Sequence, residues 1–484
     1  MPCASSGEIS VQSLTVRYPG RERPALDAVS ERIRAGETVV VTGASGSGKT
    51  TLFRVLGGFV PSMIRAKVEG DVLIDGTSVL AGDSLRPAAD VGLVQQDPDA
   101  QICTLNVWEE VAFGPENQCL APEEVIARVE ESLDSLGVAH LAGRETTRLS
   151  GGEKQRVAIA SILAMRPRVI LLDEPTANLD PRGAKEVFDL LRSIGEKDGR
   201  TLVLAEHRLA PLLPLKPRLV LLEGGRVVLR RPSISHSDLD SLGLRGRWEI
   251  PRPQPARGGP PALILEGVSF AYGETPLFDR LTLRLWPGEV LGVIGPNGSG
   301  KTTLLRLVAG LERPQAGRIL RPKTRTLGFV FQYPHQQIFE RTVRREVSIE
   351  EEITGERLIA LLHLARLDGL EEVPPLSLSL GEQRRLTVAT ALARGPELLL
   401  LDEPFIGQDR ENAAWILSQV LAARTRGAVV LVVSHDIPLV AALCDRLLYL
   451  GDEAFEGETA DVLHHLEKTG REAFTPGYWD GGSQ

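Results

Sequence analysis

The stretch GASGSGKT, from Gly43 to Thr50, decides the fold of this chain, and it occurs again as GPNGSGKT, from Gly295 to Thr302. Both copies have the spacing G-x-x-x-x-G-K-T, in which backbone N–H groups wrap a chain of phosphates and the lysine reaches the terminal ones. A β-rich run precedes each stretch and helix-forming residues follow it. Bound phosphates would therefore lie at a helix N-terminus, where the helix dipole favours negative charge. We call these two stretches the phosphate loops.

Two phosphate loops in the same context predict two phosphate-binding domains. Their threonines, Thr50 and Thr302, are expected to hold Mg²⁺ through the hydroxyl group. The candidate binding residues of the first loop and its flank are Gly43, Ser45, Gly46, Gly48, Lys49, Thr50 and Thr51. Those of the second are Gly295, Asn297, Gly298, Gly300, Lys301, Thr302 and Thr303.

Composition limits the classes of protein that fit. The chain has 484 residues, enough for two or three domains, and its 42% hydrophobic and 25% charged residues are ordinary for a globular protein. A net charge of −9 argues against a large nucleic-acid-binding surface. The longest apolar run, Ala428 to Val433, is far shorter than the roughly 18 residues that span a bilayer. We expect a cytoplasmic chain that meets a membrane only through partners.

Further segments recur in the same order in both halves, which indicates a duplicated domain. An alternating strand ends in Tyr18 in the first half and in Tyr272 in the second. Either tyrosine could stack on an adenine face or simply pack at a strand end. After each loop helix comes an apolar strand that ends in glutamine, Gln96 and Gln332, and a helical region follows. In the first half Pro122 suits the start of a helix.

Two capped helices follow, one in each half. Their first residues are LSGGE, positions 149–153, and LSLGE, positions 378–382. In each, the serine with glutamate three positions later forms a capping box. We call these the signature segments. Their candidate ligand-binding residues are Ser150, Gly151, Gly152, Ser379 and Gly381.

Paired carboxylates end the next strand in each half. Asp173 and Glu174 follow a continuous apolar run, as do Asp402 and Glu403. Such a run predicts a strand buried on both faces of a parallel sheet, whose carboxyl end is where α/β proteins place ligands. A later β-branched strand is followed by histidine in both halves, His207 and His435. Because the histidine recurs in register, a functional role is expected.

The organisation predicted is one domain over 1–245, a Pro/Gly/Arg-rich linker over 246–261 and a second domain over 262–484. The linker, extended to about 3 Å per residue where Pro-rich, could let one domain face the other. The residues after Gly451 show no clear pattern, and partial disorder is expected there.

The ordered set resembles the nucleotide-binding domain of ATP-binding-cassette (ABC) proteins, twice over. The resemblance implies an α/β fold of two tandem P-loop ATPase domains, each with a mostly parallel sheet core, an antiparallel β subdomain and a helical subdomain. It implies that ATP and Mg²⁺ are bound, with Lys49 and Lys301 at the β- and γ-phosphates. By the same resemblance Asp173, Asp402, Gln96 and Gln332 serve the metal, Glu174 and Glu403 polarise the attacking water, and His207 and His435 contact the γ-phosphate.

The family closes its domains head to tail, so that each ATP lies between one domain's phosphate loop and the other's signature segment. On that basis the loop at Lys301 would face the intact segment with Gly151. The loop at Lys49 would face the segment in which Leu380 replaces that glycine, and its side chain would impede close approach. The site at Lys49 is therefore expected to be the slower one.

The run from Asp97 to Gly114, and Phe405 to Asp409 in the second half, look like the ATPases of energy-coupling-factor (ECF) transporters, which import vitamins and cobalt. That implies a transmembrane coupling protein and a small substrate-binding membrane subunit as partners, at the cytoplasmic face of the membrane, with no nucleic acid bound. Two alternatives stay open: the fused ATPase of a sugar importer, and a soluble ABC protein that acts on the ribosome. The short Pro-rich linker and the acidic charge disfavour the second.

Overall fold

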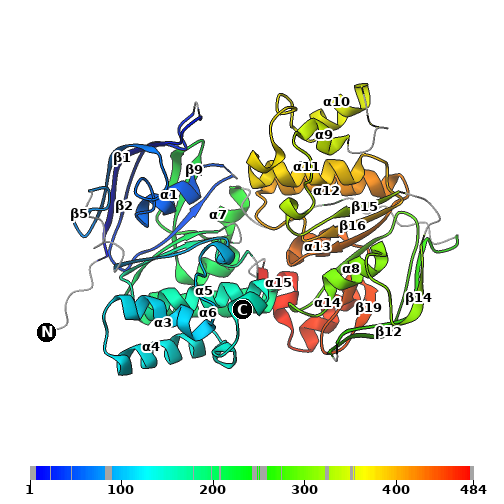
Figure 1. Cartoon of the computed structure of the whole chain (residues 1–484), viewed down its shortest axis with the longest axis horizontal. Coiled ribbons are helices and arrows are strands. Elements are labelled where there is room, and N and C mark those ends of the chain that lie inside the picture. Colours follow the sequence, from blue (N-terminus) through cyan, green and yellow to red (C-terminus); the bar gives the residue numbers. More distant parts are fainter. Residues whose placement is uncertain are drawn as a thin grey trace. The chain divides into compact units, whose positions relative to one another are not determined.

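The computed structural model of the chain divides into two compact units, Met1–Arg245 and Gly246–Gly482. It describes residues 7–479 apart from 22, 45, 82–89, 178, 198, 207–208, 243–247, 249, 251–258, 274, 322–325, 349–352 and 354. Most of the linker predicted over 246–261 lies outside the described residues, as do Ser45 and His207. Figure 1 labels the helices and strands of each unit.

The first unit is built on a six-stranded sheet of order β10-β9-β3-β8-β7-β6 (Figure 1). All neighbours pair in parallel except β10, which lies antiparallel to β9 at the edge. Strand β3 lies inside the sheet, so its TVVVT sequence is almost wholly buried. The bounds are β3 (Thr38–Thr42), β6 (Val91–Val94), β7 (Val169–Asp173), β8 (Thr201–Ala205), β9 (Arg218–Glu223) and β10 (Arg226–Arg231).

A second sheet of the first unit is antiparallel, in the order β2-β1-β4-β5. Its strands are β1 (Ile9–Arg17), β2 (Leu26–Ile33), β4 (Lys67–Ile74) and β5 (Thr77–Ser78). The helices of the unit are α1 (Lys49–Leu56), α3 (Val107–Asn117), α4 (Pro122–Ser135), α5 (Gly151–Ala164), α6 (Pro181–Lys197) and α7 (His236–Ser241). The predicted helix start at Pro122 is confirmed, and the stripe of Val125, Val129, Leu133 and Leu136 is buried.

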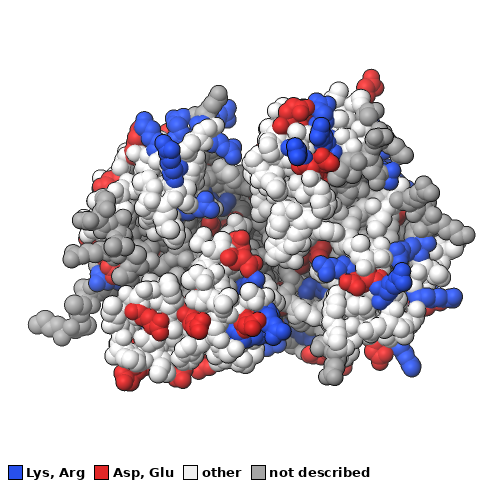
Figure 2. All heavy atoms as spheres, viewed as in Figure 1, with Lys and Arg blue, Asp and Glu red and all other residues white. Residues whose placement is uncertain are grey.

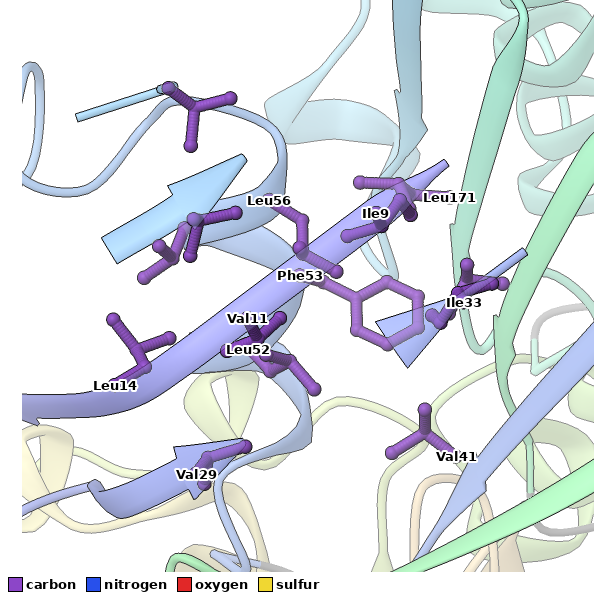
Figure 3. Close-up of a cluster of buried hydrophobic side chains, with 14 of the residues drawn as sticks. Ile9, Val11, Leu14, Val29, Ile33, Val41, Leu52, Phe53, Leu56 and Leu171 are labelled. Carbon is purple, nitrogen blue, oxygen red and sulfur yellow. The ribbon is translucent and has the colours of Figure 1, made fainter. Parts of the chain in front are cut away.

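Helix α1 is fixed by a core that both sheets of the first unit share. Leu52, Phe53 and Leu56 of α1 are at most 4% exposed, and they belong to one cluster with residues of β1, β2, β3 and β7. Figure 3 shows the ring of Phe53 among side chains of these strands. Burying a side chain of this size contributes about 1.5–3 kcal/mol. The helix behind the first phosphate loop is therefore held rigidly by packing.

The second unit repeats this plan. Its larger sheet has the order β15-β16-β17-β13-β18-β19, with β19 antiparallel at the edge, and its smaller sheet has the order β12-β11-β14. The strands are β11 (Leu263–Tyr272), β12 (Thr275–Leu285), β13 (Val290–Ile294), β14 (Ala316–Leu320), β15 (Leu327–Val330), β16 (Leu398–Asp402), β17 (Val429–Val433), β18 (Arg446–Tyr449) and β19 (Phe455–Glu458). The predicted fold class, two tandem α/β domains with a mostly parallel core, is confirmed.

The helices of the second unit include a C-terminal group that sequence patterns did not predict. They are α8 (Lys301–Ala309), α9 (Val343–Val347), α10 (Gly355–Leu364), α11 (Leu380–Leu392), α12 (Arg410–Thr425), α13 (Ile437–Leu443), α14 (Thr459–Lys468) and α15 (Pro476–Trp479). After Gly451, where partial disorder was expected, Val462, Leu466, Phe474 and Trp479 are buried. The indole N–H of Trp479 donates to the carbonyl of Ala473 at 2.7 Å. The expectation of disorder was wrong for the described residues 452–479, because these apolar side chains pack onto the sheet edge.

None of the helices in the described part of the chain combines the length and the apolar composition that crossing a bilayer requires.

Candidate active sites

Each phosphate loop joins a central strand to a helix, and its lysine begins that helix. The Lys49 ammonium donates to the carbonyls of Gly43 and Ala44 at 2.8 and 3.2 Å. The Lys301 ammonium donates to the carbonyls of Gly295 and Pro296 at 2.9 and 2.7 Å. Both lysines are at least 93% buried. A desolvated cation held against the loop backbone is well placed to bind a phosphate.

The first glycine of each loop meets the backbone of a neighbouring segment too closely for any side chain. A Cβ atom at Gly43 would lie 2.1 Å from the carbonyl oxygen of Leu222, and one at Gly295 would lie 1.9 Å from that of Leu450. Their φ angles of 150° and 149° also lie where glycine is favoured. The loop conformation thus depends on these glycines.

Sequence reasoning missed one serine in each loop. The hydroxyls of Ser47 and Ser299 are buried and have no hydrogen-bond partner among the described residues. A buried hydroxyl without a partner costs free energy, and a phosphate oxygen at the loop would remove that cost. The signal that could have found them is their place directly before the last glycine of the motif.

The predicted aspartates end strands β7 and β16, and each is beside a loop threonine. The Thr302 hydroxyl donates to Asp402 Oδ2 at 2.8 Å. Burial raises the pKa of the Asp173 carboxyl to about 6, and Glu174 adds to the rise, while a hydrogen bond from Thr50 opposes it. Burial likewise raises the pKa of Asp402. In each aspartate Oδ1 is buried with no hydrogen-bond partner in the described structure.

These atoms fit a magnesium ion. Mg²⁺ prefers oxygen ligands and is usually held by one or two carboxylates together with substrate phosphates. Each site offers a buried carboxylate oxygen without a partner beside a threonine hydroxyl, at the helix end where phosphates would bind. When bound, the ion would neutralise charge on the phosphates.

Each aspartate is followed by a glutamate with a strained backbone. The φ angles of Glu174 and Glu403 are 50° and 48°, in the left-handed region that residues other than glycine seldom adopt. Their N–H groups donate to the carbonyls of Ala205 and Val433, the last residues of β8 and β17. Strain of this kind concentrates at functional sites, where the surrounding structure enforces it.

Each glutamate has a partner in the described structure. The Gln96 amide donates to Glu174 Oε2 at 2.9 Å. Glu403 pairs with His435, whose Nε2 lies 3.1 Å from Glu403 Oε1 and whose backbone N–H donates to Oε2 at 3.1 Å. The structure thus brings Gln96 and His435 to the glutamates, while their roles toward the metal and the γ-phosphate stay predictions.

Among the described residues, the hydrogen bond that holds Gln332 to α11 is made by its backbone carbonyl. Arg384 of α11 donates through Nη1 to the carbonyl of Phe331 at 2.6 Å and through Nη2 to that of Gln332 at 2.5 Å. Burial lowers the pKa of this arginine to about 10, against the opposing effect of Asp402 and Glu403, so it is charged at neutral pH. No sequence pattern pointed to Arg384.

The signature segments head α5 and α11 with the predicted capping boxes. The Ser150 hydroxyl accepts from the N–H of Glu153, and the Ser379 hydroxyl accepts from that of Glu382, both at 3.3 Å. Leu380 takes the first helical position of α11 and is 43% exposed. Within the described residues, no hydrogen bond or ion pair joins either serine to the phosphate loop of its own unit.

The two tyrosines predicted to meet adenine have different surroundings. The Tyr18 hydroxyl donates to Thr51 Oγ1 at 3.3 Å. Tyr18 also lines a hollow of about 370 Å³ with Arg17, Pro19, Gly20, Arg21, Arg65, Ala66 and Lys67. Lys and Arg side chains gather over this end of β1 in Figure 2. Tyr272 is 49% exposed and packs edge-on against Phe270. Adenine stacking stays a prediction for both.

Comparison with known proteins places the chain in a family. The sequence model of the ABC transporter family matches residues 26–177 and 278–406. A relative from Saccharolobus solfataricus, named "Putative ABC transporter ATP-binding protein", is 33% identical over 506 residues, which cover 94% of each chain. The "Putative HMP/thiamine import ATP-binding protein YkoD" of Bacillus subtilis is 32% identical over 504 residues, covering 94% of this chain and 92% of that one.

A solved structure shows the same fold across both domains. The archaeal ribosome recycling factor aABCE1, in complex with the ribosomal stalk protein aP1, aligns with a TM-score of 0.66 over 95% of this chain and 92% of that one. The identity is 22%, so this likeness concerns the fold alone. The family match and the relatives carry the assignment: the chain belongs to the ABC transporter family, as an ATP-binding protein in which two ATPase domains are fused.

Proposed function

We propose that this protein is the ATP-hydrolysing subunit of an ECF-type importer. It would power the uptake of a vitamin, a vitamin precursor or a transition-metal ion through separate membrane subunits, from the cytoplasmic face of the membrane. Two findings support the proposal. Each domain has a glutamate at the end of a strand in contact with a predicted site residue, Gln96 in the first domain and His435 in the second. A relative that matches 94% of the chain is named for HMP/thiamine import.

In each site the chain's own residues would position the phosphates and a water molecule. Lys49 and Lys301 bind the terminal phosphates, and Glu174 and Glu403 orient the attacking water. Phosphoryl transfer needs little covalent chemistry, so positioning and charge neutralisation supply most of the rate. The strained backbone of each glutamate directs its carboxylate from the end of the strand.

Following the family resemblance, we propose that each ATP-binding site is completed by the signature segment of the other domain. Leu380 would then approach the nucleotide held by Lys49, and Gly151 the nucleotide held by Lys301. A leucine where a backbone must come close weakens that approach, so the Lys49 site would turn over more slowly.

The proposed binding to membrane partners rests on exposed apolar side chains in the segments that follow Gln96 and Gln332. Leu105 is 74% exposed and Phe113 of α3 is 51% exposed. In the second unit Phe339, two positions before the counterpart of Leu105, is 76% exposed. Exposed large apolar side chains that occur in the same segment of both domains indicate a docking surface. The resemblance implies that the coupling protein binds there.

Affinity purification of the tagged full-length chain from its native membranes tests the proposal. We expect a transmembrane protein and a small membrane subunit to co-purify with the wild type. Leu105→Glu and Phe339→Glu should each reduce their recovery about tenfold, because a charge is desolvated at the contact. The control variants Val228→Glu and Leu311→Glu alter exposed apolar residues elsewhere, 51% and 61% exposed, and should retain the partners.

Other partners would contradict the proposal. Recovery of ribosomes in place of small membrane proteins would assign the chain to translation, which its net charge of −9 disfavours. Recovery of an extracellular or periplasmic sugar-binding protein would assign it to a sugar importer.

A further inference from the structure

Arg384 is the largest of the side chains that are less than 2% exposed in the described structure, and it lies next to the second active site. Two of its guanidinium nitrogens donate to consecutive carbonyls, those of Phe331 and Gln332, at 2.6 and 2.5 Å. These carbonyls belong to the segment between β15 and the helical region. Its third nitrogen, Nε, has no hydrogen-bond partner among the described residues. The helix α11 is thereby joined to the backbone that carries Gln332.

No link of this kind is present among the described residues of the first unit. Gln155 occupies the corresponding position of α5, is fully buried, and neither its amide nitrogen nor its amide oxygen has a hydrogen-bond partner in the described part of the chain. There the side chain of Gln96 donates to Glu174. No hydrogen bond between the described residues joins Gln332 to Glu403. The two domains therefore hold their glutamines differently.

A buried cation is costly unless hydrogen bonds compensate its desolvation. At Arg384 both hydrogen bonds go to backbone carbonyls of one segment, which ties the guanidinium group to that segment, and the nearby charges of Asp402 and Glu403 add to the compensation. Planar arginine suits this task because its donors lie on separate nitrogens in a fixed fork geometry, whereas the shorter Gln155 has a single donor nitrogen, which makes no hydrogen bond to the described residues.

We propose that Arg384 is a positioning residue that fixes the Phe331–Gln332 backbone and so orients Gln332 toward the metal and water of the Lys301 site. The Lys49 site, with Gln155, lacks this fixation. The inference rests on the role proposed above for Glu403 and on the metal-related role that the family resemblance implies for Gln332. It adds a second source of inequality between the sites, inside the domain and independent of the signature segments.

Hydrogen exchange of the full-length chain tests the positioning directly and without activity. In Arg384→Gln we expect amides of residues 329–337 to exchange roughly tenfold faster than in the wild type, because two restraints on that backbone are lost. Residues 93–101 of the first unit should be unchanged. The matched control is Arg385→Gln, since Arg385 donates to Ala365 and Asn412 at 2.8 and 2.6 Å rather than to the glutamine segment.

Steady-state hydrolysis in a Glu174→Gln background then reports on the Lys301 site. Adding Arg384→Gln should raise the half-saturating Mg²⁺ concentration and lower kcat, each roughly tenfold, as removal of outer-shell partners typically does. The KM for ATP at saturating Mg²⁺ should change less than about twofold. Arg384→Lys, which keeps the charge and can reach one carbonyl, should recover part of the loss.

Failure of the proposed function and failure of the inference about Arg384 would give different results. If Glu174→Gln itself hydrolyses no ATP, Glu403 is not a working catalytic residue, and the proposed function of this site fails together with the inference. If Glu174→Gln is active but Arg384→Gln matches Arg385→Gln in exchange and in Mg²⁺ dependence, Arg384 is only structural and the inference alone is overturned.

Discussion

At the residue scale, the buried aspartates show a conflict between stability and function, because the negative charge that a metal ion needs lowers the stability of the folded protein. Asp173 has a pKa of about 6 in the folded protein against 3.8 as the ordinary value, so the folded state binds a proton more tightly than the unfolded chain. Its charge therefore costs the folded protein about 3 kcal/mol well above pH 6, and this cost disappears as the pH falls below about 4. A bound cation would offset it.

Asp173→Asn should consequently stabilise the metal-free protein while abolishing hydrolysis at its site. We expect the melting temperature of the first domain to rise by roughly 5 °C at pH 8, with about half that gain at pH 5. Differential scanning calorimetry in a chelator measures both, with Asp134→Asn as an exposed control. A lower melting temperature at pH 8 would contradict the pKa argument.

Sequence predicted the identity of these residues better than their geometry. The spacing of Lys49 and Asp173 follows from motifs, because phosphate and metal chemistry restricts residue type. The left-handed backbone of Glu174 and Glu403 could not be predicted, since their φ is imposed by hydrogen bonds to neighbouring strands. Arg384 was missed for a similar reason: its role depends on two carbonyls that no sequence pattern specifies.

At the scale of the element, each phosphate loop is shaped by where its glycines lie. Gly295→Ala should reduce the free energy of unfolding of the second domain by at least about 3 kcal/mol, because the new methyl group would lie 1.9 Å from the Leu450 carbonyl. Gly298→Ala also has a positive φ but open space around it, and it should cost about 1 kcal/mol. Urea unfolding of the two variants measures the difference, and equal losses would show that the close approach is unimportant.

Strong local patterns let the sequence predict most elements near the sites. The buried strands before each loop, the capped helices α5 and α11, and the start of α4 at Pro122 all follow from local signals. The C-terminal helices did not, because they are short and their apolar residues are buried through tertiary packing. The apolar spacing of Val462 and Leu466 was the one available signal.

At the scale of the whole molecule, one ATPase domain has been duplicated and its copies have diverged. The second copy has Arg384 in place of Gln155 and Leu380 in place of Gly151. If each ATP-binding site is completed by the signature segment of the other domain, both differences favour the site at Lys301. That site would face the intact segment with Gly151, and Arg384 would hold the backbone of its Gln332. Exposed apolar residues after both glutamines, such as Leu105 and Phe339, would let either domain transmit its state to a membrane partner.

Mg²⁺-dependent ATP hydrolysis by Glu174→Gln, Glu403→Gln and the double variant, measured side by side with the wild type, tests this account most directly. We predict that Glu174→Gln keeps most of the wild-type turnover, that Glu403→Gln loses most of it, and that the double variant is inactive. Equal losses in the two single variants, or turnover that survives in the double variant, would contradict the account.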